Sequence, residues 1–215
     1  MQNLYICDMV RKEITDYIEQ HILPQYETFD AAHRTDHATT VIERSMKLAR
    51  HYEVNEEMVY VVAAYHDIGL QFGREMHHRE SARLVRDDAH LRQWFTTEQI
   101  GTIAEAAEDH RASAKCEPRS IYGRIVAEAD RAIEPMSILR RTVQYGLAHY
   151  PQLSKEEHWN RTLEHMAEKY AEGGYLRLWI SESDNATKLK ELREIIKDRV
   201  RLRQIFEQIF EQEIK

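Results

Sequence analysis

The sequence predicts an all-α fold, and three observations support that prediction. Glycine and proline are scarce, at 7 and 4 of 215 residues, so helices meet few breaks. Apolar residues recur at intervals of three and four along most of the chain, which is the spacing of one face of an α-helix. No segment alternates apolar and polar residues in the manner of a half-buried strand.

Six helices are expected in the first two thirds of the chain, each bounded by a capping or breaking residue. The third is the clearest, because Asn55 and two glutamates precede the apolar run Met58–Tyr65, as an N-cap and an acidic first turn would. The first helix stops at Pro24. The expected ranges are about Asp8 to Ile22, His37 to His51, Asn55 to Asp67, a helix from near His78 through Val85, Thr96 to His110, and Ser120 to Ile133.

Two further helices are expected near the C-terminus. Ser154 and Glu157 have the spacing of a capping box, and the helix that they open ends near Gly173-Gly174. The last helix runs from about Asp184 to Lys215 without glycine or proline. A straight helix of that length would be a rod of about 45 Å. It must therefore bend, fold over the body of the protein, or pack against a partner such as a second copy.

Composition excludes several classes of function. The formal net charge of −7 and the absence of a Lys/Arg run argue against stable nucleic-acid binding. No apolar stretch approaches the roughly 20 residues of a membrane span, and the start lacks the features of a signal peptide. Two distant cysteines, Cys7 and Cys116, predict free thiols in a reducing cytosol. We therefore expect one soluble, cytoplasmic domain.

The most informative feature is the dipeptide His66-Asp67 at the end of the apolar third helix. An imidazole and a carboxylate are costly to bury unless a partner such as a metal ion stabilises them. His37 opens the second helix and Asp130 lies among apolar residues of the sixth. Antiparallel helices can bring such positions to one end of a bundle. Two imidazoles and two carboxylates suit Mn, Fe, Co, Ni or Zn, and the lack of thiolates argues against a closed structural zinc site.

The local sequence around these residues resembles that of the HD-domain superfamily of metal-dependent phosphohydrolases. Tyr65-His66-Asp67-Ile68-Gly69 is similar to the apolar-His-Asp-Ile-Gly signature of the superfamily, and Ala127–Arg131 is similar to its closing Ala-Asp-Arg segment. The resemblance covers about residues 33–135, with 136–215 as a C-terminal helical elaboration of the same domain. The segment Asp109–Ser113 and the long last helix further resemble a subgroup of small, stand-alone bacterial HD hydrolases.

The resemblance implies a metal site and a reaction. Its expected ligands are His37, His66, Asp67 and Asp130, for one or two divalent transition-metal ions, with Mg also open. His78 and His110 occupy places that complete a second metal site or contact phosphate in some branches, and which of His77 and His78 turns inward stays open. The implied reaction is hydrolysis of a small phosphorylated molecule, above all a nucleotide, by a metal-activated water.

Residues next to the expected ligands supply the rest of the predicted catalytic set. Arg111 is the first choice for phosphate contact, ahead of Arg34, Arg79 and Arg131, and His110 is a general acid if it is not a ligand. Two other functions fit the same pattern. One is a di-iron oxygenase similar to inositol oxygenase, because six ligand candidates are present. The other is a non-catalytic HD module that binds a ligand or partner.

Overall fold

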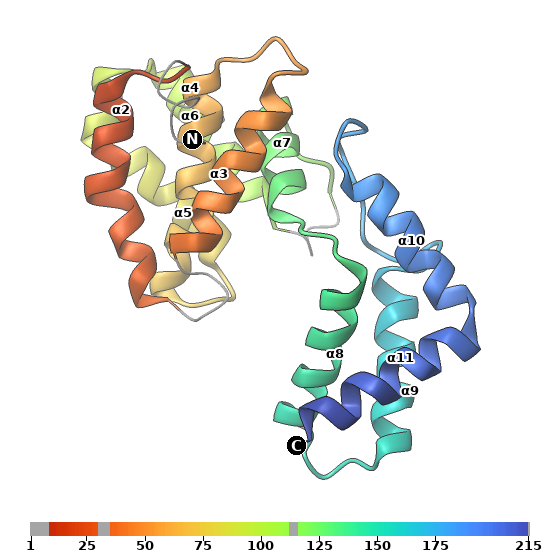
Figure 1. Cartoon of the computed structure of the whole chain (residues 1–215). Helices are drawn as coiled ribbons and strands as arrows, with labels where there is room; N and C mark the ends of the chain where they lie inside the picture. Colours follow the sequence, from red (N-terminus) through yellow and green to blue (C-terminus); the bar gives the residue numbers. More distant parts are fainter. Residues whose placement is uncertain (1–8, 30–34, 112–115, 215) are drawn as a thin grey trace. The chain divides into compact units, whose positions relative to one another are not determined.

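The computed structural model describes residues 9–29, 35–111 and 116–214, and these residues contain helices and loops but no β-strand (Figure 1). The all-α prediction is confirmed. The chain divides into two compact units. The first comprises Met1–Arg131 and Trp179–Ser183, and the second comprises Ala132–Leu178 and Asp184–Lys215. Cys7, Asp8 and Arg34 lie outside the described residues.

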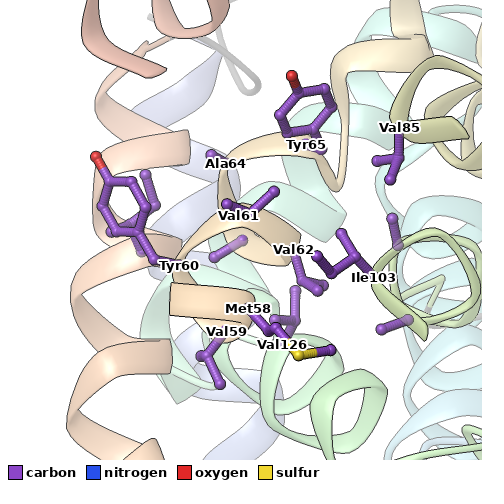
Figure 2. Packing of buried hydrophobic residues seen from close by; sticks show 14 of the residues in the cluster. Met58, Val59, Tyr60, Val61, Val62, Ala64, Tyr65, Val85, Ile103 and Val126 are labelled. Carbon is purple, nitrogen blue, oxygen red and sulfur yellow. The ribbon is translucent and has the colours of Figure 1, made fainter. Parts of the chain in front are cut away.

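The first unit is built around α4 (Glu56–Tyr65), which contacts its neighbours on several sides. Asn55 caps it as predicted, since its side chain accepts hydrogen bonds from the amides of Glu57 and Met58. Every residue from Met58 to Tyr65 is buried. In Figure 2, Val62 lies beside Ile103 and Met58 lies beside Val126. An apolar surface on all sides is what a central helix requires.

The other helices of the first unit follow the predicted order with small shifts at their ends. Those that pack against α4 include α3, α6 and α7, and α5 packs mainly on α6. The capping of α6 is a full capping box formed by Thr96 and Gln99. The helices are α3 (Thr35–Ala49), α5 (His77–Asp87), α6 (Thr97–Asp109) and α7 (Ile121–Asp130), with short 3-10 turns η3 (Ile68–Phe72) and η4 (Ala89–Gln93).

The N-terminal helix differs from the prediction because helical structure continues past Pro24. The α-helix α2 (Lys12–Tyr17) runs into a π-helical turn, η1 (Ile18–Ile22), and then into a 3-10 turn, η2 (Leu23–Thr28). Pro24 is at the start of η2, where a missing amide proton leaves no hydrogen bond unmade. A proline therefore changes the type of helix here without ending it.

The second unit has its own apolar core, contributed by four helices. One of them, α8 (Pro135–His149), was not predicted, although Pro135 occupies the first helical turn, a position that favours proline. α9 (Lys155–Lys169) has the predicted capping box, in which Ser154 and Glu157 bond to each other's backbone amides. It ends four residues before Gly173, earlier than predicted.

The expected C-terminal rod bends. α10 (Asn185–Lys197) and α11 (Arg199–Glu213) are separated at Asp198, whose backbone leaves the helical region at φ −81° and ψ 89°. The Asp198 side chain caps α11 by accepting from the amide of Arg201. Leu192 and Phe206 are buried in the core of this unit, so the bend lets both halves cover it.

Each unit has its own apolar core. That residues 136–215 elaborate a single domain stays a prediction. The boundary after Arg131 lies close to residue 136. The exception is the five-residue segment Trp179–Ser183, which belongs to the first unit although it follows α9 in sequence. No helix in the described parts of the chain is long and apolar enough to cross a membrane.

Candidate metal centre

The centre begins at the C-terminal end of α4, where His66 and Asp67 leave the helix. His66 is fully buried and Asp67 is 4% exposed. The Tyr26 hydroxyl donates to the carbonyl of Ala64 at 2.8 Å and accepts from the Asp67 amide at 3.3 Å. This bridge satisfies backbone groups that the end of a buried helix would otherwise leave unpaired. The turn is therefore held in a conformation that directs both side chains to the same place.

One group of donor atoms forms around Oδ2 of Asp67. Nε2 of His66 lies 3.4 Å from this oxygen and Nε2 of His37, from α3, lies 3.7 Å from it. The two imidazole nitrogens are 3.3 Å apart. Asp130, the last residue of α7, adds a carboxylate oxygen that is 3.2 Å from Nε2 of His37 and 4.0 Å from Nε2 of His66. Three helices thus bring together the four predicted ligands.

A second group of donor atoms forms around the other oxygen, Oδ1, of the same carboxylate. Nε2 of His77 lies 3.3 Å from Oδ1 and Nε2 of His110 lies 3.2 Å from it. These two imidazole nitrogens are 3.2 Å apart, and both histidines are buried. Asp67 therefore stands between the two groups, with one oxygen directed to each.

Gly69 explains how His77 comes close enough to Asp67. A Cβ atom at this position would lie 2.1 Å from the carbonyl oxygen of His77 and 2.6 Å from the amide nitrogen of Ser81. The Gly69 amide donates to the Ser81 hydroxyl at 3.0 Å. The glycine of the His-Asp-Ile-Gly motif thus lets η3 lie directly against the first turn of α5.

Three of the four histidines share a local device that orients the ring. Nδ1 of His66 bonds to the carbonyl of Ala63 at 2.8 Å, Nδ1 of His77 to that of Arg74 at 2.7 Å, and Nδ1 of His110 to that of Ala107 at 2.5 Å. A carbonyl oxygen only accepts, so each Nδ1 carries the proton. In its neutral form, each of these rings presents the Nε2 lone pair to the centre, as metal-binding histidines do.

The two carboxylates of the centre favour positive charge on the groups that face them. Burial, and then the nearby His110, lower the pKa of His77 to about 4, so His77 is neutral at pH 7. Burial opposes protonation of His37, but hydrogen bonds to Asp130 and Asp67 outweigh it and raise the pKa of His37 to about 9. The Asp67 pKa lies well below its usual range, because nearby histidines, above all His66, outweigh the effect of burial.

This donor set fits divalent cations. Bare imidazole nitrogens and carboxylate oxygens that face one another at 3.2 to 3.7 Å repel unless a proton or a cation lies between them. Donors bound to one ion at about 2.1 Å are themselves separated by about 3.0 to 3.4 Å for octahedral or tetrahedral angles. Most of the observed separations, from 3.2 to 3.4 Å, lie in that range, whereas His37 to Asp67 at 3.7 Å and His66 to Asp130 at 4.0 Å exceed it. The N/O donors suit Mn, Fe, Co, Ni or Zn.

Of the two adjacent histidines between which the sequence leaves the choice open, the structure places His77 beside Asp67. His77, at the first helical position of α5, joins the second group of donors, whereas the His78 ring lies at 74° to the His77 ring with centroids 5.6 Å apart. The side chain of His78 is close to Arg111, which contributes with burial to lowering the pKa of His78. Adjacent positions on a helix point about 100° apart, so only one of the two histidines can face Asp67.

The candidate arginines lie in different environments. Arg111 directly follows His110 and donates to the backbone carbonyl of Glu75 at 2.7 Å. Arg79 is exposed and lies 3.9 Å from Glu108. Arg131 is buried, with its guanidinium over the Trp179 ring. Among the candidate arginines that the structure describes, only Arg111 combines a place next to a donor histidine with partial exposure.

Part of the sequence and the fold are similar to known proteins. Residues 34–133 match the family described as the HD domain. The fold is similar to the crystal structure of a predicted HD superfamily hydrolase from an uncultured Thermotogales bacterium, with a TM-score of 0.52 and 18% sequence identity over 78% of this chain and 92% of that one. No curated protein sequence matches the chain.

Proposed function

Since this chain is an HD-domain protein, we propose that it is a metal-dependent phosphohydrolase with two adjacent divalent cations, and that it acts on a small phosphorylated molecule, above all a nucleotide. The observation that carries the proposal is the Asp67 carboxylate, which faces His37 and His66 through Oδ2 and His77 and His110 through Oδ1. A carboxylate shared in this way is how proteins hold two ions close enough to act on one phosphoryl group.

In the proposed reaction, the side chains of the centre hold two metal ions. His37, His66, Asp67 and Asp130 would hold one ion, and Asp67, His77 and His110 would hold the other. Bound divalent ions supply a water of lowered pKa and stabilise charge on phosphoryl oxygens. The backbone carbonyls behind three of the histidines keep the Nε2 atoms aimed at the centre, so little reorganisation is needed when substrate enters.

Arg111 is the proposed phosphate-binding residue. Its Nη1 is held by the carbonyl of Glu75, which leaves other N–H groups of the planar guanidinium to meet an anion. Its sequence neighbour His110 lies at the second group of donors. If that group holds no ion, the Nε2 proton that Asp67 stabilises on His110 could pass to a leaving oxygen instead.

The proposal is tested by measuring metal content and hydrolysis together. We expect His66→Ala and Asp67→Ala each to lose bound metal and at least about 100-fold in turnover of nucleotides and phosphomonoesters with Mn, Co, Ni or Mg. His149→Ala and Asp87→Ala are matched controls, because both side chains are exposed and far from these ligands in sequence. Wild-type protein that binds no divalent metal, or full turnover in both site variants, would overturn the proposal.

A di-iron oxygenase is the second candidate, because the six side chains at the centre are four histidines and two aspartates, which also suit iron. Iron analysis of the isolated protein and measurement of oxygen consumption separate the two reactions. Oxygen uptake that depends on iron, with no phosphate released from any nucleotide or phosphomonoester, would favour the oxygenase.

A further inference from the structure

Glu128 is a fully buried carboxylate that belongs to no group of metal donors. It lies two residues before Asp130 on α7. Its Oε2 accepts from the backbone amide of Trp179 at 2.8 Å, and its Oε1 accepts from the hydroxyl of Ser183. A buried carboxylate is costly to desolvate unless such hydrogen bonds compensate. The segment Trp179–Ser183, here called the strap, provides a donor at each of its ends.

The strap has further attachments in the first unit. Ile180 is 2% exposed and is part of the apolar core of that unit. The hydroxyl of Tyr52 donates to the carboxylate of Glu182 at 2.6 Å. The Trp179 ring packs against the same core and lies under the guanidinium of Arg131, 6.0 Å from the ring centroid. The strap is therefore held by apolar, hydrogen-bonding and cation–π contacts.

These contacts lie on both sides of Asp130. Trp179 contacts Glu128, two residues before the ligand, through its amide and Arg131, one residue after it, through its ring. Asp130 is the last residue of α7, and the backbone leaves the helix at Arg131 with φ −76° and ψ 82°. Helix ends fray when nothing holds the final turn. A carboxylate that must stay close to His37 is thus located where a helix would be least rigid by itself.

We propose that Glu128 and the strap position Asp130 for metal binding. Glu128 is a positioning residue. The strap residues affect metal binding only through their contacts with Glu128 and Arg131. Loss of one strap donor lets the last turn of α7 move, and the Asp130 carboxylate then spends less time at the distance that a shared cation requires. The inference rests on the metal site of the proposed function and on none of its reaction steps.

The test uses the full chain and compares two serines of the strap. Ser183 donates to Glu128, whereas Ser181 donates to Glu182 at 2.9 Å on the exposed side. We expect Ser183→Ala to raise the dissociation constant for Mn2+ about 10-fold, as loss of groups behind metal ligands commonly does, and Ser183→Thr to restore it. Ser181→Ala should leave it within about twofold, since Glu128 keeps both donors.

Calorimetric titration of metal-free protein with Mn2+, well below the melting temperature of each variant, measures these constants without any substrate. Equal Mn2+ affinity in wild type, Ser183→Ala and Ser181→Ala would overturn the inference. So would a loss in Ser183→Ala that Ser183→Thr does not restore. Wild type that binds no Mn2+, Co2+ or Ni2+ would instead overturn the proposed function, so the two failures are distinguishable.

Discussion

The two carboxylate oxygens of Asp67 face different pairs of histidines, so each histidine of the centre belongs to one group of donors. His77 and His110 face one oxygen, and His37 and His66 face the other. The neighbouring residue His78 lies outside both groups. The metal stoichiometry of single variants therefore reports on each group separately.

We expect His77→Ala to lower the metal content from two ions per chain to about one, because it removes an Nε2 donor from the second group only. His78→Ala is the matched control and should keep the wild-type content. Elemental analysis after exhaustive dialysis measures both. Loss of metal in His78→Ala with none in His77→Ala would contradict the geometry.

A second polar cluster at the residue scale affects stability as a function of pH. Burial would raise the pKa of Asp88, but hydrogen bonds from the hydroxyls of Tyr17 and Tyr65 and from the amide of His90 lower it below its ordinary value. A lowered folded-state pKa gives stability that is complete above the unfolded value of about 3.9 and is lost as pH falls through the folded value.

We expect Tyr17→Phe to lower the free energy of unfolding by about 1–2 kcal/mol at pH 7, since it removes a hydrogen bond to a charged and mostly buried carboxylate. The difference from wild type should shrink below about pH 3.9, as Asp88 becomes protonated. Urea unfolding of metal-free protein at several pH values measures this. Tyr145→Phe, at a ring that is 51% exposed, should change little.

At the scale of elements, the contact between η3 and α5 decides whether the second group of donors forms. Gly69 has no room for a Cβ atom, because the backbone of His77 and Ser81 occupies that space. Gly101, in α6, has no atom within 4 Å of the position of a Cβ. Substitution of each glycine by alanine therefore compares a position with no room for a Cβ atom with one where the space is open.

We expect Gly69→Ala to destabilise the protein by about 1–3 kcal/mol and to weaken binding of the second ion, because α5 and His77 must move away from Asp67. Gly101→Ala should stabilise by about 0.5–1 kcal/mol, as alanine favours a helix interior. Thermal unfolding and elemental analysis of both variants measure these effects. A Gly69→Ala protein with unchanged stability and metal content would refute the close-packing argument.

At the scale of the whole molecule, the metal donors and the strap belong to the first unit, and the second unit has a core of its own. A cation that binds only the folded centre stabilises the unit that contains it. The effect of metal on local stability should therefore be concentrated in part of the chain.

We expect Mn2+ at about 100 times its dissociation constant to add about 2.7 kcal/mol for each ion bound, which corresponds to a rise of about 5–10 °C in melting temperature per ion. Hydrogen exchange should slow in α3, α4 and α7, which carry or precede the ligands of the first ion, and in α5 and α6, which carry or precede those of the second, and change least in α10 and α11. Asp67→Asn should abolish the shift. Equal slowing in all of these helices would contradict the localisation.

Much of this architecture was predictable because its signals are local. Asn55 and the apolar run after it specify a buried, capped helix whatever surrounds them. The helix from Pro135 was missed because its apolar residues are spaced among many polar ones, and the bend at Asp198 has no glycine or proline to mark it. Both are stabilised by packing in the second unit, which a local pattern does not contain.

The sequence by itself determined the helical class and the order of the helices in the first unit, since periodicity and capping depend on neighbouring residues. It predicted His37, His66, Asp67 and Asp130 as ligands, because a buried His-Asp pair is costly without a metal and the residues around it resemble the HD pattern. Only the tertiary structure decided that His77 faces Asp67 and that the strap bonds to Glu128. The physical reason is distance along the chain. The close approach at Gly69 and the return of residues 179–183 join segments whose relation depends on packing and not on local propensity.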